Sequence, residues 1–158
     1  MKKELLKGFT MLVLVVVLAL ATAVVSANAQ SSNRLVADIP FEFSVGYMAI
    51  PAGEYSVKPV TAAGNALMIQ SADGTLNAVR LSDETAQTKD KPHARLVFHR
   101  YGQRYFLAEV WNGTDATGRQ LLQSQEERAI ERELASISAT NETAKNTYEI
   151  VEVVASLR

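Results

Sequence analysis

Apolar and polar residues alternate with a period of two near the start of the chain, over residues 35–45. The apolar positions are Leu35, Ala37, Ile39, Phe41, Phe43 and Val45. Such a repeat turns one face of a strand toward a core and the other toward water. Because Pro40 has no N–H to donate to a ladder, we expect this strand at a sheet edge or with a bulge at Pro40.

Further short strands are predicted downstream, each bounded by turn residues. A turn at Pro51–Gly53 leads into a second strand, since Pro fixes φ and Gly allows a positive φ. The dipeptide Asp73-Gly74 predicts a tight hairpin between the strands on either side of it. The polar segment 82–94 is predicted as a solvated loop.

The clearest hairpin signal lies in residues 95–112, where two apolar and aromatic runs flank Gly102-Gln103. Gly at the first loop position suits a two-residue type II′ turn. This turn pairs Tyr101 with Arg104, Arg100 with Tyr105, and His99 with Phe106. A slip by one residue would exchange the two faces of the hairpin.

A single helix is predicted over 124–138, because Ser124 and Glu127 form a Ser-x-x-Glu capping box at its start. The residues Ile130, Leu134 and Ile137 form a narrow apolar stripe on this helix. We expect the stripe to pack on the protein's own sheet, since short isolated helices are marginal in water.

The polar segment after the helix is followed by a last predicted strand over 147–155, rich in Val, Ile and Tyr. Together these elements predict a mainly β fold. We expect a small antiparallel β-barrel or sandwich of about six to seven strands, with one α-helix in the C-terminal half. Residues 30–158 are expected to form a single β-rich domain.

The first 29 residues are typical of a secretory signal peptide, a helix that precedes the domain. Lysines open the chain, an apolar run covers 11–25, and Ala27 and Ala29 occupy the small positions before a cleavage site. Cleavage is expected between Ala29 and Gln30, which makes the product periplasmic or secreted. The apolar run is also near the lower length limit for a spanning helix, so an uncleaved anchor in the inner membrane is the alternative.

Composition narrows the chemistry of the mature domain. Removing residues 1–29 takes three Lys and one Glu from the 16 basic and 17 acidic residues, which leaves a formal charge of −3. This balance offers no basic field for nucleic acid and none for anionic lipid, so membrane contact is expected only through an uncleaved signal segment. The chain has no Cys, which excludes disulfides, thiol catalysis and Cys-based zinc sites.

Candidate chemistry is sparse. His93 and His99 lack the spacing of a metal site, so no metal ligand, no catalytic residue and no cofactor is predicted. Counted from the Gly102 turn, one hairpin face carries two charged and two aromatic residues that are candidates for ligand binding: Arg100, Tyr105, Glu109 and Trp111. The competing interpretation is a core face whose charges form ion pairs.

Several motifs resemble a group of small exported bacterial proteins of unknown function. They are Ile39–Gly46 (IPFEFSVG), Pro51–Tyr55 (PAGEY), Leu96–Gly102 (LVFHRYG) and Tyr105–Trp111 (YFLAEVW), extended by Gly118-Arg119 and Ser124–Arg128. The resemblance implies export and a compact, largely β domain. It implies no activity and no functional residue.

The favoured hypothesis is an exported envelope protein that is not an enzyme and that binds an unknown partner protein or plays a structural role. The alternative is a barrel that carries a small apolar ligand on the Trp111 face. A hydrolase built on two carboxylates is the third hypothesis, although no pair of acidic residues stands out from the sequence.

Overall fold

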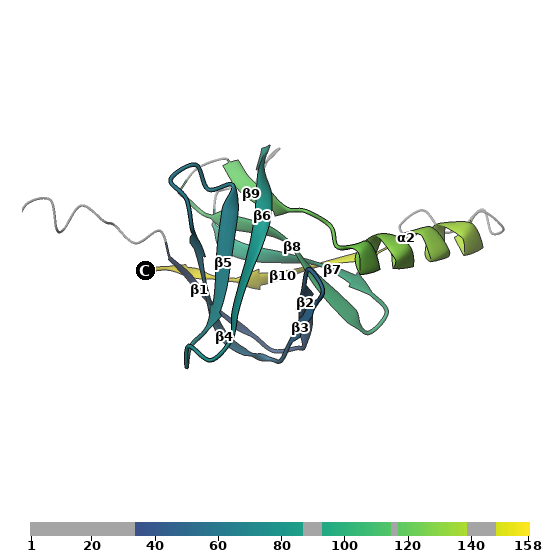
Figure 1. Cartoon of the computed structure of the whole chain (residues 1–158), viewed down its shortest axis with the longest axis horizontal. Coiled ribbons are helices and arrows are strands. Elements are labelled where there is room, and N and C mark those ends of the chain that lie inside the picture. Colours follow the sequence, from purple (N-terminus) through teal and green to yellow (C-terminus); the bar gives the residue numbers. More distant parts are fainter. Residues whose placement is uncertain (1–33, 87–92, 115–116, 139–147) are drawn as a thin grey trace, which may run out of the picture. The chain divides into compact units, whose positions relative to one another are not determined.

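Two largely antiparallel sheets that share one long strand make up most of the protein. The computed structural model, drawn in Figure 1, describes residues 34–86, 93–114, 117–138 and 148–158, which belong to one unit, Asn33–Arg158. The elements are β1 (Leu35–Ile39), β2 (Phe43–Val45), β3 (Met48–Ile50), β4 (Gly53–Pro59), β5 (Ala66–Ser71), β6 (Asn77–Ala86), β7 (Ala94–Tyr101), β8 (Arg104–Asn112), β9 (Thr117–Leu121), α2 (Gln125–Ser138), β10 (Glu149–Val154) and β11 (Ser156–Leu157).

Strand β6 passes from one sheet to the other. Its first half, Asn77–Leu81, pairs with β5, and its second half, Ser82–Ala86, pairs with β9. The strands follow the order β10-β7-β8-β9-β6-β5-β4-β1-β11, and the short β2 pairs with β3 and β8. A strand that changes sheets in this way forms a corner between two packed layers.

The C-terminal segment adds a strand to each sheet at the edge far from β6. Strand β10 pairs with β7, and β11 pairs with β1 after a single intervening residue, Ala155. The Ala155 N–H donates to the carbonyl of Ala94 at 2.9 Å. The path of ladders stays open, because β10 and β11 do not pair with one another among the described strands. The predicted mainly β fold is therefore confirmed, with an unclosed sheet that is consistent with a sandwich.

The core lies between the two sheets. Its largest fully buried side chains come from β1, β2, β3, β4, β5, β7 and β8, and they are Phe43, Phe98, Phe106, Ile39, Ile50, Ile69, Leu96 and Val57. Of these, Phe106 belongs to a second buried layer on the other side of β8, outside the main cluster. Phe43 meets Tyr55 and Phe98 edge to face, with ring centroids 5.3 and 5.4 Å apart. Such pairs add to the free energy of burial.

The hairpin register near the Gly102 turn is as predicted, with Tyr101 opposite Arg104 and the next three pairs in step. A β-bulge then shifts the register between Val97 and Phe98. On β8 the extra residue is Ala108, because Leu107 pairs with Phe98 while Glu109 already pairs with Val97. Beyond the bulge every β8 side chain points to the face opposite to the one predicted.

Three other expectations about the strands are wrong. The predicted strand over 35–45 is broken after Ile39, so that β1 and β2 are separate strands on either side of Pro40. The predicted loop over 82–94 is wrong at both ends of its described part, since β6 continues to Ala86 through its pairing with β9 and β7 begins at Ala94. The described residues hold eleven strands rather than six or seven, because short strands such as β3, β9 and β11 lack a clear alternating pattern.

Helix α2 begins as predicted, but its last turn does not pack on the sheet. Ser124 caps it, with its Oγ accepting from the N–H of Glu127 at 3.0 Å. The first turn lies against the strands, and the helix then runs away from them (Figure 1). Glu127 is 3% exposed, whereas Ile137 in the last turn is 56% exposed. The expectation that the whole stripe packs on the sheet is therefore wrong at Ile137.

The predicted signal peptide and its cleavage site, Ala29–Gln30, lie outside the described residues. Within the described part of the chain, no helix has both the length and the apolar character needed to cross a membrane.

Gly118 on β9 offers a direct test of the packing beyond the bulge. A Cβ built on Gly118 would lie 2.6 Å from the Trp111 ring, so Gly118→Ala is expected to lower the free energy of unfolding by about 2 kcal/mol. Chemical denaturation measures this loss. In a Trp111→Ala background the same substitution should cost little, since the clashing ring is gone. Equal costs in the two backgrounds would contradict the packing.

Candidate functional site

The bulge separates the four residues that were predicted to share a binding face. Arg100 and Tyr105 oppose each other before the bulge, whereas Glu109 and Trp111 follow it and point to the other side. The structure therefore brings them together as two pairs and not as one site. The prediction from strict alternation that all four residues share one face is wrong.

Arg100 and Tyr105 lie at the margin of the core face. The Arg100 guanidinium is 3.1 Å from the Glu149 carboxylate of β10 and donates through Nε to the Gly102 carbonyl at 2.8 Å. Tyr105 stacks on Phe41 with ring centroids 4.0 Å apart. These contacts fit the competing interpretation, in which the charge is paired and the ring fills the edge of the core.

Glu109 and Trp111 belong to a second buried layer on the opposite face of β7 and β8. The Trp111 indole N–H donates to Glu109 at 2.8 Å, and the Arg95 guanidinium lies 4.8 Å from the Trp111 ring. Arg95 Nε is 3.3 Å from the Glu152 carboxylate, yet neither Nε nor Nη1 of this buried side chain forms a hydrogen bond of good geometry. The ring face and the nearby carboxylate charge stabilise Arg95 in place of hydrogen bonds.

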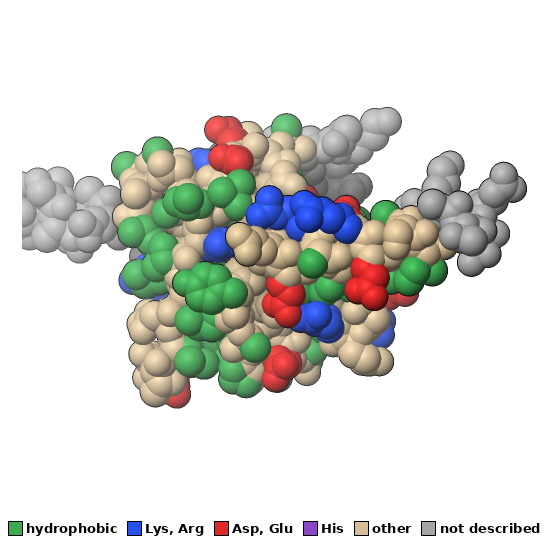
Figure 2. Space-filling view, turned by 45° about the vertical axis from the view of Figure 1, so that its right-hand side comes forward, with side chains coloured by type: hydrophobic (Ala, Val, Ile, Leu, Met, Phe, Trp, Pro, Cys, Tyr) green, Lys and Arg blue, Asp and Glu red, His purple; other side chains and the backbone are tan. Residues whose placement is uncertain are grey.

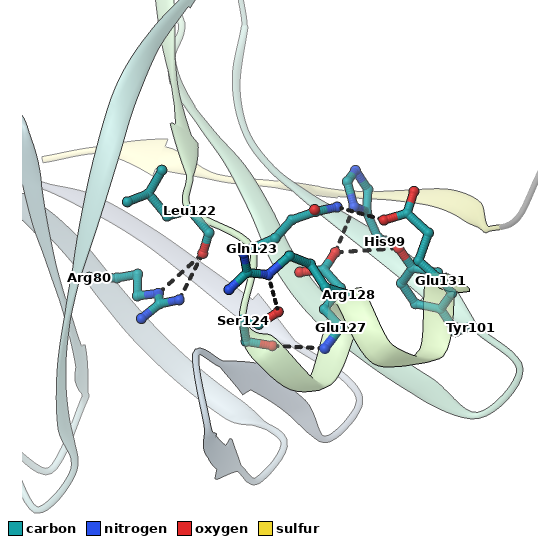
Figure 3. A network of polar contacts seen from close by, with 9 residues as sticks. All are labelled: Arg80, His99, Tyr101, Leu122, Gln123, Ser124, Glu127, Arg128 and Glu131. Carbon is teal, nitrogen blue, oxygen red and sulfur yellow. Dashed lines mark hydrogen bonds and ion pairs between the residues drawn. The ribbon is translucent and has the colours of Figure 1, made fainter. Parts of the chain in front are cut away.

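The best-buried polar cluster lies where helix α2 meets β7. Figure 3 shows Glu127 pointing from the first helical turn toward His99 and Tyr101. The His99 Nδ1–H donates to Glu127 Oε1 at 2.9 Å, and the Tyr101 hydroxyl is 3.5 Å from the same oxygen. The His99 ring stacks on Tyr148 at 4.0 Å between centroids. This cluster fastens the start of the helix to the sheet.

Sequence reasoning found both partners of this contact without joining them. It assigned His99 to a strand and Glu127 to a capping box, and the two are 28 residues apart. A capping box has two hydrogen bonds, and here only the one from the Glu127 N–H to the Ser124 hydroxyl forms. The Glu127 carboxylate contacts His99 and Tyr101 instead. The signal that could have suggested this pair is a His within the hairpin and a Glu in the first turn of the helix that follows it.

A cavity of about 210 Å³ opens at the opposite end of the described unit from the Gly102 turn. Its apolar lining includes four core residues, Leu35, Val57, Leu67 and Val110, together with Pro59 and Ala62. Polar groups of Asn112 and Thr117 and the cations Lys58 and Arg119 also line it. None of the residues predicted for ligand binding is among the lining residues.

An apolar surface, here called the β6 strip, is the other notable feature. Its members are Tyr47, Met48, Val79, Leu81 and Leu122, whose exposed fractions run from 37% for Met48 to 90% for Tyr47. Val79 and Leu81 alternate outward from β6, and the Leu122 N–H donates to the Leu81 carbonyl at 3.2 Å. Tyr47 from the β2–β3 turn and Met48 at the start of β3 line a hollow together with Val79.

Arg80 fastens the segments of the β6 strip to one another. Its Nε and Nη2 donate to the Leu122 carbonyl at 3.2 and 2.9 Å. The same guanidinium lies against Gly46, where a Cβ would come within 3.3 Å of it. Three segments distant in sequence therefore present one continuous surface.

Within the described ranges, no three His, Cys, Asp or Glu side chains come together in a way that could hold a metal ion. Comparison of the chain with models of known families, with curated proteins and with solved structures finds no match. The function is therefore argued from the chain's own residues.

The Glu127 contact predicts a large difference between two adjacent glutamates. Glu127→Ala leaves His99 buried without its acceptor and should lower the free energy of unfolding by about 2–4 kcal/mol. Glu126→Ala, in the same helical turn, removes an exposed ion pair with Arg104 and should cost less than about 1 kcal/mol. Urea denaturation compares the two variants, and equal losses would contradict the buried pair.

Tyr101 predicts a loss of stability at high pH. Burial raises the pKa of its hydroxyl above the ordinary value of 10.0, and the negative charge of Glu127 raises it further. Since the unfolded chain releases this proton first, the stabilisation is complete below about pH 10 and declines as the pH rises through and beyond that value. Urea midpoints at about pH 8 and pH 11 should fall less in Tyr101→Phe than in the wild type. Equal declines would refute the assignment.

Proposed function

We propose that this chain is an exported, non-enzymatic domain that binds a partner protein in the bacterial envelope through the β6 strip. The export half of the proposal is supported by the N-terminal pattern with Ala29–Gln30 and by the resemblance to small exported bacterial proteins. The binding half is supported by the exposed apolar side chains of the strip.

The strip is costly to leave in water. Tyr47, Leu81 and Val79 are each more than half exposed, although they are large and apolar. Covering apolar surface stabilises a complex by about 25 cal/mol for each Å² removed from water, and contiguous exposed patches are common at protein interfaces. Figure 2 shows hydrophobic side chains gathered over the strands of this face.

The surroundings of the strip favour a protein partner with charged groups around an apolar centre. Tyr, Met and Arg are enriched at protein interfaces, and all three occur here. Arg128 is exposed, and its Nε donates to the carbonyl of Ser124. Ser124 lies two residues after Leu122 in the sequence. Side chains of both charges, Lys and Arg as well as Asp and Glu, border the hydrophobic area in Figure 2.

A pair of valine substitutions tests the strip. Val79→Asp puts a charge at its centre, and Val154→Asp puts one on β10, where Val154 is also an exposed strand residue. A photo-activatable residue at position 122 is introduced into the wild type and both variants, in the native host. We expect one cross-linked adduct in the wild type and in Val154→Asp, and its reduction by about tenfold in Val79→Asp.

The identity of the adduct decides the proposal. Its mass and peptide sequence should show one partner protein of the envelope. An adduct between two copies of this chain would overturn the partner assignment, and the same yield from both Asp variants would overturn the role of the strip. A photo-activatable residue at position 154 should give no such adduct.

A further inference from the structure

We propose that the cavity beside Arg119 is a binding site for a small carboxylate with a short aliphatic body. This site uses none of the residues of the β6 strip and goes beyond the partner binding proposed above. It also differs from the predicted ligand face, since Trp111 is 4% exposed and packs against Gly118 and Arg95.

The charges of the cavity indicate an anion. Among its described lining residues two are cations, Lys58 and Arg119, and none is acidic, in a chain whose formal net charge is −1. Glu84 lies opposite Arg119 across the β6–β9 ladder, but it is exposed and does not line the cavity. The local field therefore favours a negative group at the two cationic side chains.

Arg119 is held in place before any ligand arrives. Its Nη2 donates to the Ala63 carbonyl at 2.7 Å, across 56 residues of sequence. The guanidinium lies flat against Gly64, where an added Cβ would come within 2.9 Å of Nη2. A guanidinium has five N–H donors in a rigid fork, so one bond to Ala63 leaves most of them for a carboxylate.

The loop that carries Ala63 and Gly64 is itself fixed to β6. The Ser82 hydroxyl donates to the Gly64 carbonyl at 2.9 Å, and the Ser82 N–H donates to the Asn65 carbonyl at 2.9 Å. Gly64 has a φ of +66°, a backbone conformation that other residues rarely adopt. Because a preorganised donor loses little entropy on binding, this wall is suited to anion recognition.

The size and the remaining lining set the body of the ligand. A volume of about 210 Å³ corresponds to about seven water molecules at about 30 Å³ each. The side chains of Val57, Leu67 and Val110 provide an apolar surface for an aliphatic chain. A carboxylate of about eight non-hydrogen atoms, such as hexanoate, matches both the volume and the charge.

An NMR titration of the ¹⁵N-labelled chain with sodium hexanoate tests the site. Hexylammonium chloride and hexanol are the matched controls, since they keep the aliphatic body and change the charge. We expect saturable shifts at the amides of Gly64, Val110 and Gly118, with a Kd of about 1 mM or tighter. Both controls should bind about tenfold more weakly.

Substitutions separate this site from general attraction to the protein. Lys58→Gln changes an exposed side chain and should weaken hexanoate binding about fivefold without unfolding the protein. Arg128→Gln, an exposed arginine outside the cavity, should leave the affinity unchanged. Absence of saturation at about 10 mM, hexylammonium or hexanol binding equal to that of hexanoate, or largest shifts around Arg100 and Tyr105 would each overturn the proposal.

Discussion

A single β-bulge between β7 and β8 determines which way the second half of β8 faces. The extra residue, Ala108, lets Leu107 and Val110 both point into the core, although a strict alternation would send one of them out. The same residue turns Trp111 to the opposite face, under Gly118. The insertion therefore places Val110 in the main core and Trp111 in the second buried layer.

Two arginines then fix the surfaces on which the functional proposals rest. Arg80 and Arg119 each reach a backbone carbonyl of a distant segment, and each lies flat on a glycine of positive φ, 68° at Gly46 and 66° at Gly64. A planar guanidinium suits this role because it can pack by its face and donate by its edge. One of these contacts assembles the β6 strip, and the other forms a wall of the cavity.

Local signals in the sequence predicted local structure well. The turn at Gly102 gave the correct register near Tyr101, and Ser124 was the correct helix cap. The bulge could not be found in this way, because both faces of β8 carry buried apolar side chains, Leu107 and Val110 on one and Phe106 and Trp111 on the other. The contact between His99 and Glu127 was missed for another reason, since it joins elements that only the tertiary fold brings together. For the same reason the sequence did not reveal the cavity, whose lining is drawn from segments between Leu35 and Arg119.

The most direct test of this account is the environment of the Trp111 ring, measured by nuclear Overhauser effects in solution. The bulged hairpin predicts contacts from the ring to the Hα atoms of Gly118 and to the side chain of Arg95. A hairpin without the bulge would instead place the ring on the face of Phe98 and Leu107. Contacts from the Trp111 ring to the side chain of Leu96, the nearest β7 residue on that face, with none to Gly118, would contradict the account.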